Sequence, residues 1–304
     1  MRMYNSYMKF KTRKTKKIIS LAAAMLFLCL VAAEYLGLFD SASVPAAGGG
    51  EVSVYYIDVG QGDSEFIRDP SGKTMLIDAG THSSASSLVA FLDGLGTETI
   101  DYFVLSHPHE DHIGGAVSVF ENFDIGTVIM PDAYAETSVF TEVMRAVENE
   151  GCERILASPG ASLSLGQSEL NILSPFEESC KDLNNSSIVL RLTYLDTSFV
   201  FTGDAEKFAE NIILDSYPAR ELKCDVIKLG HHGSSTSSSE KFLSALDPRY
   251  AIISCGASNE YGHPHKKTLE ALEKHGIKYF RTDRDGTILA LSDGKEIAYI
   301  GKMN

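Results

Sequence analysis

The segment Ser106–Gly115, with the sequence SHPHEDHIGG, constrains this chain more than any other feature. It follows the run DYFVLS (101–106), which is typical of a strand, and precedes an expected helix over 113–123. Histidine nitrogens and carboxylate oxygens are the ligands that proteins offer to zinc and similar divalent ions. The segment therefore predicts a metal site at the exit of a strand, with the candidate ligands His107, His109, Asp111 and His112.

The irregular backbone between a strand and a helix can direct such side chains at two centres. Two divalent ions about 3.5–4 Å apart are suited to hydrolysis of phosphoesters, esters or amides. We therefore expect a hydrolase with two divalent ions, zinc or manganese.

The rest of the chain alternates short β-rich runs with helical stretches from residue 51 onward. Two successive sets of strands with intervening helices predict an α/β fold of two face-to-face sheets, with helices outside. The first set of expected strands is 52–59, 64–68, 74–79, 101–106, 126–130 and 153–157. The second set is 169–174, 186–195, 198–203, 224–230, 249–254, 278–282, 287–291 and 296–300. The expected helices are 83–95, 113–123, 139–149, 205–215, 239–246 and 266–275.

The N-terminal part has the order of a targeting signal. A basic segment (1–17) precedes an apolar one (18–39) that is typical of a signal peptide or a membrane anchor, with the basic end cytoplasmic. Residues 40–50 predict a flexible linker, and 51–304 the folded hydrolase domain. We expect an exported protein, either extracellular or held outward-facing by residues 18–39 if these are not cleaved.

The charge balance limits the choice of substrates. Beyond residue 33, 20 Lys and Arg face 41 Asp and Glu, so non-specific DNA binding by phosphate neutralisation is not expected. Any polyanion must be held locally. Four cysteines follow the apolar segment without a CxxC pair, which allows disulfides but does not predict structural zinc; we expect Cys224 and Cys255 to be buried thiols.

The HPHEDH segment matches the HxHxDH signature of the metallo-β-lactamase superfamily, whose fold is a four-layer αββα sandwich. Over residues 51–290 the chain resembles the hydrolase domain of ComEC-type competence proteins for DNA uptake and its stand-alone relatives. It contains one apolar segment in place of a multi-helix channel. The motifs that carry the resemblance are DVGQGDS (58–64), LIDAG (76–80), NNSSIVL (184–190), TGD (202–204), KLGHHGS (228–234) and YGHPH (261–265).

The resemblance implies a division of ligands between two ions. A histidine of the HHGS turn completes the second site, and we favour His231 over His232. Many members place a third histidine in the first site where this chain has its Asn185–Ser187 region, which makes manganese a competitor to zinc. His107 and His109 would bind the first ion, Asp111 and His112 the second, and Asp204 both.

The resemblance also implies supporting roles. Asp111 would orient or deprotonate the attacking water, and His265 or His263 would supply a proton to the leaving group or bind the substrate phosphate. Asp78 would fix the orientation of a ligand ring. The expected supporting residues are Asp63, Asp78, Asn185 and Ser187.

These expectations favour an exported phosphodiesterase or nuclease that acts on DNA. The alternatives are hydrolysis of a cell-envelope phosphodiester of the choline-phosphate or teichoic-acid type, hydrolysis of a β-lactam or lactone, and a non-enzymatic module that binds DNA for uptake. The sequence names no protein partner.

Overall fold

Two mixed β-sheets pack face to face in the computed structural model, which describes residues 49–303. The predicted basic segment, the signal or anchor segment and most of the linker lie outside the described residues. Within 49–303, no helix has the length and apolar character needed to cross a membrane.

The first sheet has eight strands in the order β15-β14-β1-β2-β3-β4-β5-β6. Strands β3 to β6 run parallel to one another, and the remaining neighbours are antiparallel. The bounds are β1 Val52–Tyr56, β2 Glu65–Arg68, β3 Thr74–Ile77, β4 Thr99–Val104, β5 Asp124–Met130, β6 Glu153–Leu156, β14 Ile288–Ser292 and β15 Ile297–Lys302.

The second sheet has seven strands in the order β13-β12-β11-β10-β9-β8-β7. Here β10 to β13 are parallel, whereas β7 to β10 form an antiparallel meander. The bounds are β7 Ser162–Leu165, β8 Ser168–Ser174, β9 Val189–Tyr194, β10 Thr197–Phe201, β11 Val226–Lys228, β12 Tyr250–Ile253 and β13 Lys278–Arg281.

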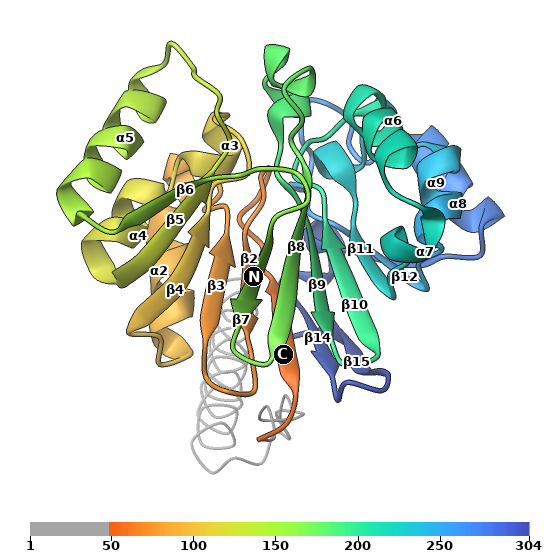
Figure 1. Cartoon of the computed structure of the whole chain (residues 1–304), viewed down its shortest axis with the longest axis horizontal. Helices are drawn as coiled ribbons and strands as arrows, with labels where there is room; N and C mark the ends of the chain where they lie inside the picture. Colours follow the sequence, from red (N-terminus) through yellow and green to blue (C-terminus); the bar gives the residue numbers. More distant parts are fainter. Residues whose placement is uncertain (1–48, 304) are drawn as a thin grey trace, which may run out of the picture. The chain divides into compact units, whose positions relative to one another are not determined.

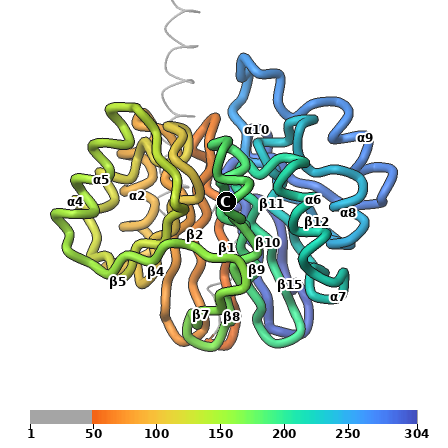
Figure 2. The backbone as a smooth tube through the Cα atoms, turned by 45° about the horizontal axis from the view of Figure 1, so that its top comes forward, coloured from red at the N-terminus to blue at the C-terminus, as the bar shows by residue number. Residues whose placement is uncertain are grey.

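Helices cover the outer face of each sheet, as Figures 1 and 2 show, with α2, α4 and α5 on one side and α6, α8 and α9 on the other. This is the expected four-layer arrangement. The α-helices are α2 Ala85–Gly94, α3 Glu110–Ile113, α4 Ala116–Asn122, α5 Ser138–Glu150, α6 Lys207–Ser216, α7 Ala219–Leu222, α8 Glu240–Leu246, α9 Lys266–Lys274 and α10 Thr282–Asp285. The 3-10 helices are η1 His82–Ser84, η2 Ser179–Lys181, η3 Asn184–Ser186 and η4 Gly230–Gly233.

Alternation along the strands builds two apolar layers. In β10, Phe199 and Phe201 face the core between the sheets, whereas Val200 packs in the cluster with the outer helices. On the first sheet, Tyr55 contacts Phe91 of α2 with ring centroids 5.9 Å apart. Because successive side chains of a strand point to opposite faces, each sheet is buried on both sides.

The last two strands correct the predicted grouping. Residues 287–291 and 296–300 were expected in the second sheet, but β14 and β15 belong to the first, where Val54 of β1 pairs with Ala290. These strands pair with the start of the domain. Such pairing between distant segments cannot be predicted from the order of the strands along the chain.

Several boundaries also differ from the expected ones. The predicted strand 186–195 begins at Val189, because η3 precedes it. The predicted helix 113–123 is divided into α3 and α4 at Gly114 and Gly115. A β-carbon on Gly115 would collide with the carbonyl oxygen of Ala79, so the division lets two loops approach closely. Strand β7 and the short helices α7 and α10 were not predicted.

Candidate metal centre

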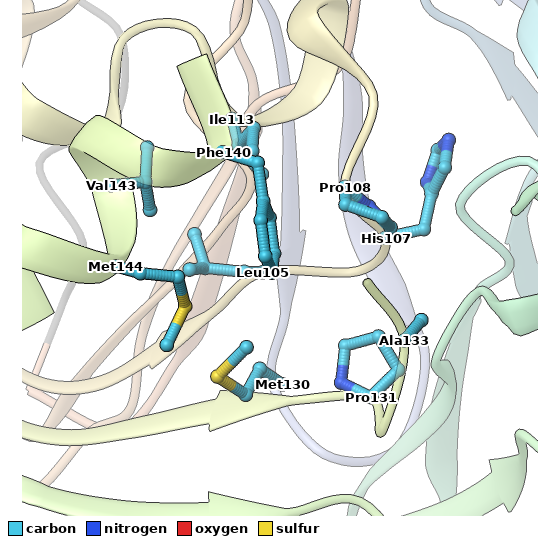
Figure 3. A pocket seen from close by; sticks show the side chains of 10 residues that line it. All are labelled: Leu105, His107, Pro108, Ile113, Met130, Pro131, Ala133, Phe140, Val143 and Met144. Carbon is cyan, nitrogen blue, oxygen red and sulfur yellow. The ribbon is translucent and has the colours of Figure 1, made fainter. Parts of the chain in front are cut away.

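The histidine loop begins where β4 ends and is supported by apolar side chains. His107 is fully buried and points away from Leu105 and Phe140 in Figure 3. The cavity beside it has a volume of about 10 Å³, room for about one water molecule. These apolar side chains therefore position His107 and offer no space for a ligand.

His107 and His109 present ring nitrogens to the same point. His107 Nε2 lies 3.0 Å from His109 Nδ1. Two nitrogen ligands of a tetrahedral zinc ion, each about 2.0–2.1 Å from the metal, are themselves about 3.3 Å apart. The pair has the spacing expected of two ligands of one ion.

Asp111 and His112 lie on the short helix α3, which follows directly. His112 is buried, and its Nδ1 lies 2.7 Å from Asp78 Oδ2, which leaves Nε2 directed at the cluster. Asp78 also accepts hydrogen bonds from the backbone and hydroxyl groups of Ser106, at 2.7 and 2.6 Å. Asp78 thus contacts the start of the histidine loop and fixes the orientation of one of its rings.

The carboxylate of Asp204, just after β10, lies between the two groups of histidines. Its Oδ1 is 3.3 Å from His112 Nε2, and its Oδ2 is 3.9 Å from His107 Nε2. Oδ2 also lies 3.7 Å from the Nε2 atoms of both His231 and His232. The two oxygens therefore face different imidazoles, as a bridging carboxylate requires.

The two histidines after β11 differ in their surroundings. His232 is buried, its Nδ1 lies 3.0 Å from Ser254 O, and its Nε2 lies 3.1 Å from Asp111 Oδ2. His231 is partly exposed, and its Nδ1 lies 3.2 Å from Glu206 Oε1. Ligand atoms of Asp111, His112, Asp204 and His232 all lie within 4.8 Å of one another. The structure thus brings His232 into this cluster, whereas the sequence favoured His231.

Two unpartnered buried atoms test whether the cluster fits a cation. His112 Nε2 and Asp204 Oδ1 have no hydrogen-bond partner, although they face each other at 3.3 Å. With its Nδ1 bonded to Asp78, a neutral His112 ring would present its Nε2 lone pair to a carboxylate oxygen, so this pair needs a positive charge between its atoms. A divalent ion between these atoms would satisfy both, so the residues fit a metal.

The pKa shifts of His112 and His232 arise from the same crowding of imidazoles and carboxylates. Burial lowers the pKa of His112, but the carboxylates around it, Asp204 and Asp78 first, outweigh burial and hold that pKa well above its usual value. Burial likewise lowers the pKa of His232, which Asp204 and Asp63 raise to about 10. Four carboxylates thus hold protons on two buried imidazoles, and a cation bound there would take the place of those protons.

A buried ion pair lies directly behind the cluster. Lys228 of β11 is bonded to Asp63 Oδ2, and its Nζ also donates to Gly203 O at 3.2 Å. The other oxygen of Asp63 lies 3.1 Å from His232 Nδ1. Asp63 was predicted as a supporting residue, but Lys228 was not identified as its partner from the sequence. The signal was a lysine within the apolar run CDVIKLG.

The Asn185–Ser187 region is arranged differently from the expectation. Asn185 Oδ1 accepts hydrogen bonds from the backbone nitrogens of Glu206 and Ala209 at 3.2 Å, so this amide faces the start of α6 rather than the metal cluster. Asn184 lines the cleft in its place, with its Oδ1 unpartnered. Ser187 Oγ accepts from the backbone nitrogen of Asp204 at 3.0 Å and so supports the loop that carries this carboxylate.

The cluster lies at the base of a cleft of about 500 Å³. His263 lines this cleft and His265 does not. His265 immediately precedes α9, its Nδ1 accepts from Ser235 N at 2.9 Å, and its Nε2 lies 3.2 Å from Tyr261 O. Both ring nitrogens of His265 therefore contact backbone atoms of neighbouring loops. Of the two predicted proton donors, only His263 lines the cleft.

The four cysteines in the described part of the chain are free, and Cys224 and Cys255 are buried, as expected for apolar thiols.

The chain is similar to curated competence proteins along most of its length. It is 35% identical over 256 residues to ComE operon protein 3 of Bacillus subtilis, which covers 79% of this chain and 32% of the relative. It is 34% identical over 239 residues to Competence protein ComA of Neisseria gonorrhoeae, with 78% and 32% covered. Recombination protein 2 of Haemophilus influenzae is 32% identical over 226 residues, with 72% and 26% covered. The chain thus spans about a third or less of the length of these relatives.

Solved structures share the fold at low sequence identity. The metallo-beta-lactamase fold protein YhfI of Bacillus subtilis has a TM-score of 0.50 at 12% identity, with 76% of this chain and 95% of that chain covered. The diiron beta-hydroxylase CmlA of Streptomyces venezuelae has a TM-score of 0.51 at 14% identity, with 76% and 52% covered. The Metallo-beta-lactamase superfamily profile matches residues 57–257. By its fold, its clustered histidines and this match, the chain belongs to the metallo-β-lactamase superfamily.

Proposed function

We propose that the chain is a metal-dependent phosphodiesterase that acts on DNA and uses two divalent ions. The observation that carries this proposal is the position of Asp204, whose carboxylate lies 3.3 Å from His112 Nε2 and 3.9 Å from His107 Nε2, one histidine from each proposed ligand set. When bound, the two ions would supply Lewis acidity and an activated water for hydrolysis.

The ligands divide into two sets. His107, His109 and Asp204 hold the first ion. Asp111, His112, Asp204 and His232 hold the second, with His232 assigned in preference to His231 because its Nε2 faces Asp111 at 3.1 Å. Oxygen and nitrogen ligands without thiolates suit zinc and manganese alike.

Other residues act on the substrate. His263 lines the cleft, and burial first, then the neighbouring histidines, lower its pKa to about 4. It is therefore neutral at pH 7 and offers a hydrogen bond, rather than a charge, to the phosphate or the leaving oxygen. Asp111, which is partly exposed in the cleft, orients the attacking water.

The relatives support DNA as the substrate, since one of those named above is a competence protein and another a recombination protein. The order of basic and apolar residues in 1–39 supports export. Together these support a role outside the membrane in DNA uptake.

A second candidate is hydrolysis of a small cell-envelope phosphodiester. The described lining of the cleft includes Glu110 and Glu260 but no Lys or Arg. Such a lining favours a substrate with few phosphates over a long polyanion.

The test is cleavage by the purified chain with manganese or zinc, on single- and double-stranded DNA and on small phosphodiesters. We expect cleavage of DNA that Asp111→Ala abolishes together with metal binding. Absence of cleavage of every substrate in both metals would refute the proposal. DNA cleavage that persists in Asp111→Ala would point to a contaminating nuclease.

A further inference from the structure

The loop between β12 and α9 holds an exposed aromatic ring at the cleft. Tyr261 is 61% exposed and lines the same 500 Å³ cleft as Asp204 and His232. Its ring stacks on that of His263, with centroids 5.6 Å apart and an angle of 23° between the planes. A large aromatic ring held in solvent beside a reaction centre is a binding surface for a planar group.

Hydrogen bonds fix this loop. Asn259 Nδ2 donates to Gly256 O and His263 O at 2.9 and 2.7 Å, and Asn259 Oδ1 accepts from His263 N at 2.9 Å. Gln61, from the loop after β1, accepts from Gly256 N at 3.0 Å. The Tyr261 ring therefore lies on a loop that is held by internal hydrogen bonds and by one hydrogen bond to the loop after β1 of the first sheet.

Two buried nitrogens of the same wall have no partner. Gln61 Nε2 and His263 Nδ1 are inaccessible and make no hydrogen bond, although both residues line the cleft. His263 is itself 8% exposed. A buried polar atom without a partner costs free energy, so each side chain would gain a hydrogen bond by turning towards a ligand that presents polar atoms at its edge.

We propose that Tyr261, Gln61 and His263 form a nucleobase subsite, in which the base beside the scissile phosphate stacks on Tyr261 and places its polar edge against Gln61 and His263. This inference rests on the proposed function, since the phosphate of the same nucleotide would lie at Asp204.

The charges of the cleft favour a base over a phosphate chain. Because its described lining has Glu110 and Glu260 and no Lys or Arg, binding of the strand beyond the phosphate at the two ions cannot come from phosphate neutralisation by side chains of the cleft. Stacking on an aromatic ring binds any base by its face. We therefore expect a shallow dependence of KM on salt.

The same geometry disfavours a quaternary ammonium group. Such a cation is bound by a cage of aromatic faces, whereas Tyr261 is the single aromatic ring other than histidine in the described lining. A trimethylammonium group also has no atom that could bond to Gln61 Nε2 or His263 Nδ1. A base edge has such atoms.

The first experiment compares a single-stranded oligonucleotide with one that carries abasic tetrahydrofuran residues. We expect Tyr261→Leu to raise KM for the base-containing strand by about 5- to 150-fold, the equivalent of about 1–3 kcal/mol for one stacked base, with kcat retained. The abasic strand should show no such change. Tyr261→Phe should behave like the wild type. Tyr134→Leu is the matched control, since Tyr134 is 68% exposed and does not line the cleft.

The second experiment does not depend on turnover. A single strand that contains 2-aminopurine beside a non-hydrolysable phosphate linkage is added to the metal-loaded wild type and to metal-loaded Tyr261→Leu. Stacking on Tyr261 should quench the fluorescence in the first and leave it unchanged in the second. Equal fluorescence in both would overturn the subsite.

The outcomes separate the two proposals. Quenching that depends on Tyr261, without cleavage of any strand, would support the subsite and refute the phosphodiesterase. Cleavage of base-containing and abasic strands at equal KM, unchanged by Tyr261→Leu, would overturn the subsite and leave the phosphodiesterase. Selective hydrolysis of a choline phosphodiester that depends on Tyr261, with no effect of the base, would overturn the nucleobase assignment.

Discussion

Lys228 and Asp63 form an ion pair behind the metal centre, with each side chain only 1% exposed. Lys228 belongs to β11 of the second sheet, and Asp63 to the loop that joins β1 and β2 of the first. Burial lowers the pKa of Lys228, but Asp63 and Glu65 outweigh burial and raise it, so the lysine stays charged. One pair thus connects the two sheets and supports His232 through Asp63.

We predict that Lys228→Met destabilises the protein by about 3–5 kcal/mol, because it leaves Asp63 buried without its cation. Chemical denaturation of the metal-free protein measures the loss. Lys223→Met is the control, since Lys223 is 62% exposed in its pair with Asp247, and its loss should be within about 1 kcal/mol. Equal losses in the two variants would show that the buried pair has no special role.

We predict that His232→Ala loses the second ion, whereas His231→Ala retains two ions per chain. Removal of a ligand should weaken binding by more than the roughly 10–100-fold that loss of an outer hydrogen-bonding partner costs. Competition with a chelator measures the metal affinity of each purified variant, and metal analysis measures the number of ions per chain. Loss of the second ion from His231→Ala but not from His232→Ala would assign His231 as the ligand.

We predict that His263→Ala binds metal normally and lowers kcat/KM, because His263 lines the cleft but is not one of the clustered ligands. His265→Ala should have the smaller effect on kcat/KM, since its ring nitrogens contact Ser235 and Tyr261 of the loop. Steady-state kinetics with metal-loaded protein compares them. A larger loss in His265→Ala would return the catalytic role to that residue.

We predict that Asp69→Asn lowers stability at neutral pH by about 1–3 kcal/mol. Asp69 Oδ2 accepts from Ser168 Oγ at 2.7 Å and its Oδ1 from Gln167 N at 3.1 Å, so it joins the β2–β3 turn to the β7–β8 turn. Burial raises the pKa of Asp69, but the hydrogen bonds from Ser71 and Ser168 outweigh burial and lower it. A lowered pKa in the folded state adds stability above about pH 4, which is lost as the pH falls below that value.

Urea denaturation between about pH 3 and pH 7 tests this dependence. The difference between the wild type and Asp69→Asn should shrink towards the acidic end. Asp247→Asn is the exposed control. A difference that stays constant with pH would show that the Asp69 charge does not contribute.

The strand pattern and the histidine motif predicted the α/β class and a metal site after β4, because alternation and ligand type are local properties of the sequence, whereas the place of Asp204 was implied by the family resemblance. The place of β14 beside β1 could not be predicted in this way, since it depends on pairing between the two ends of the domain. The choice between His231 and His232 was equally inaccessible. Both residues have left-handed backbone, with φ of 52° and 54°, and only the resulting turn decides which ring enters the cluster.

The contributions of Asn184, Tyr261 and Lys228 also follow from tertiary structure. Asn184 and Asn185 are adjacent, yet the start of α6 binds the amide of Asn185 and leaves Asn184 to the cleft. Lys228 would disrupt an apolar strand were it not paired with Asp63, which lies far away in the sequence. Such roles depend on partners that a linear pattern does not contain.

The position of β1 between β14 and β2 has a consequence for synthesis on the ribosome. Val52–Tyr56 emerges long before its partner Ile288–Ser292 is translated. Until then β1 has a free edge that can pair with another nascent chain. A product that ends before residue 287 would keep this edge and aggregate.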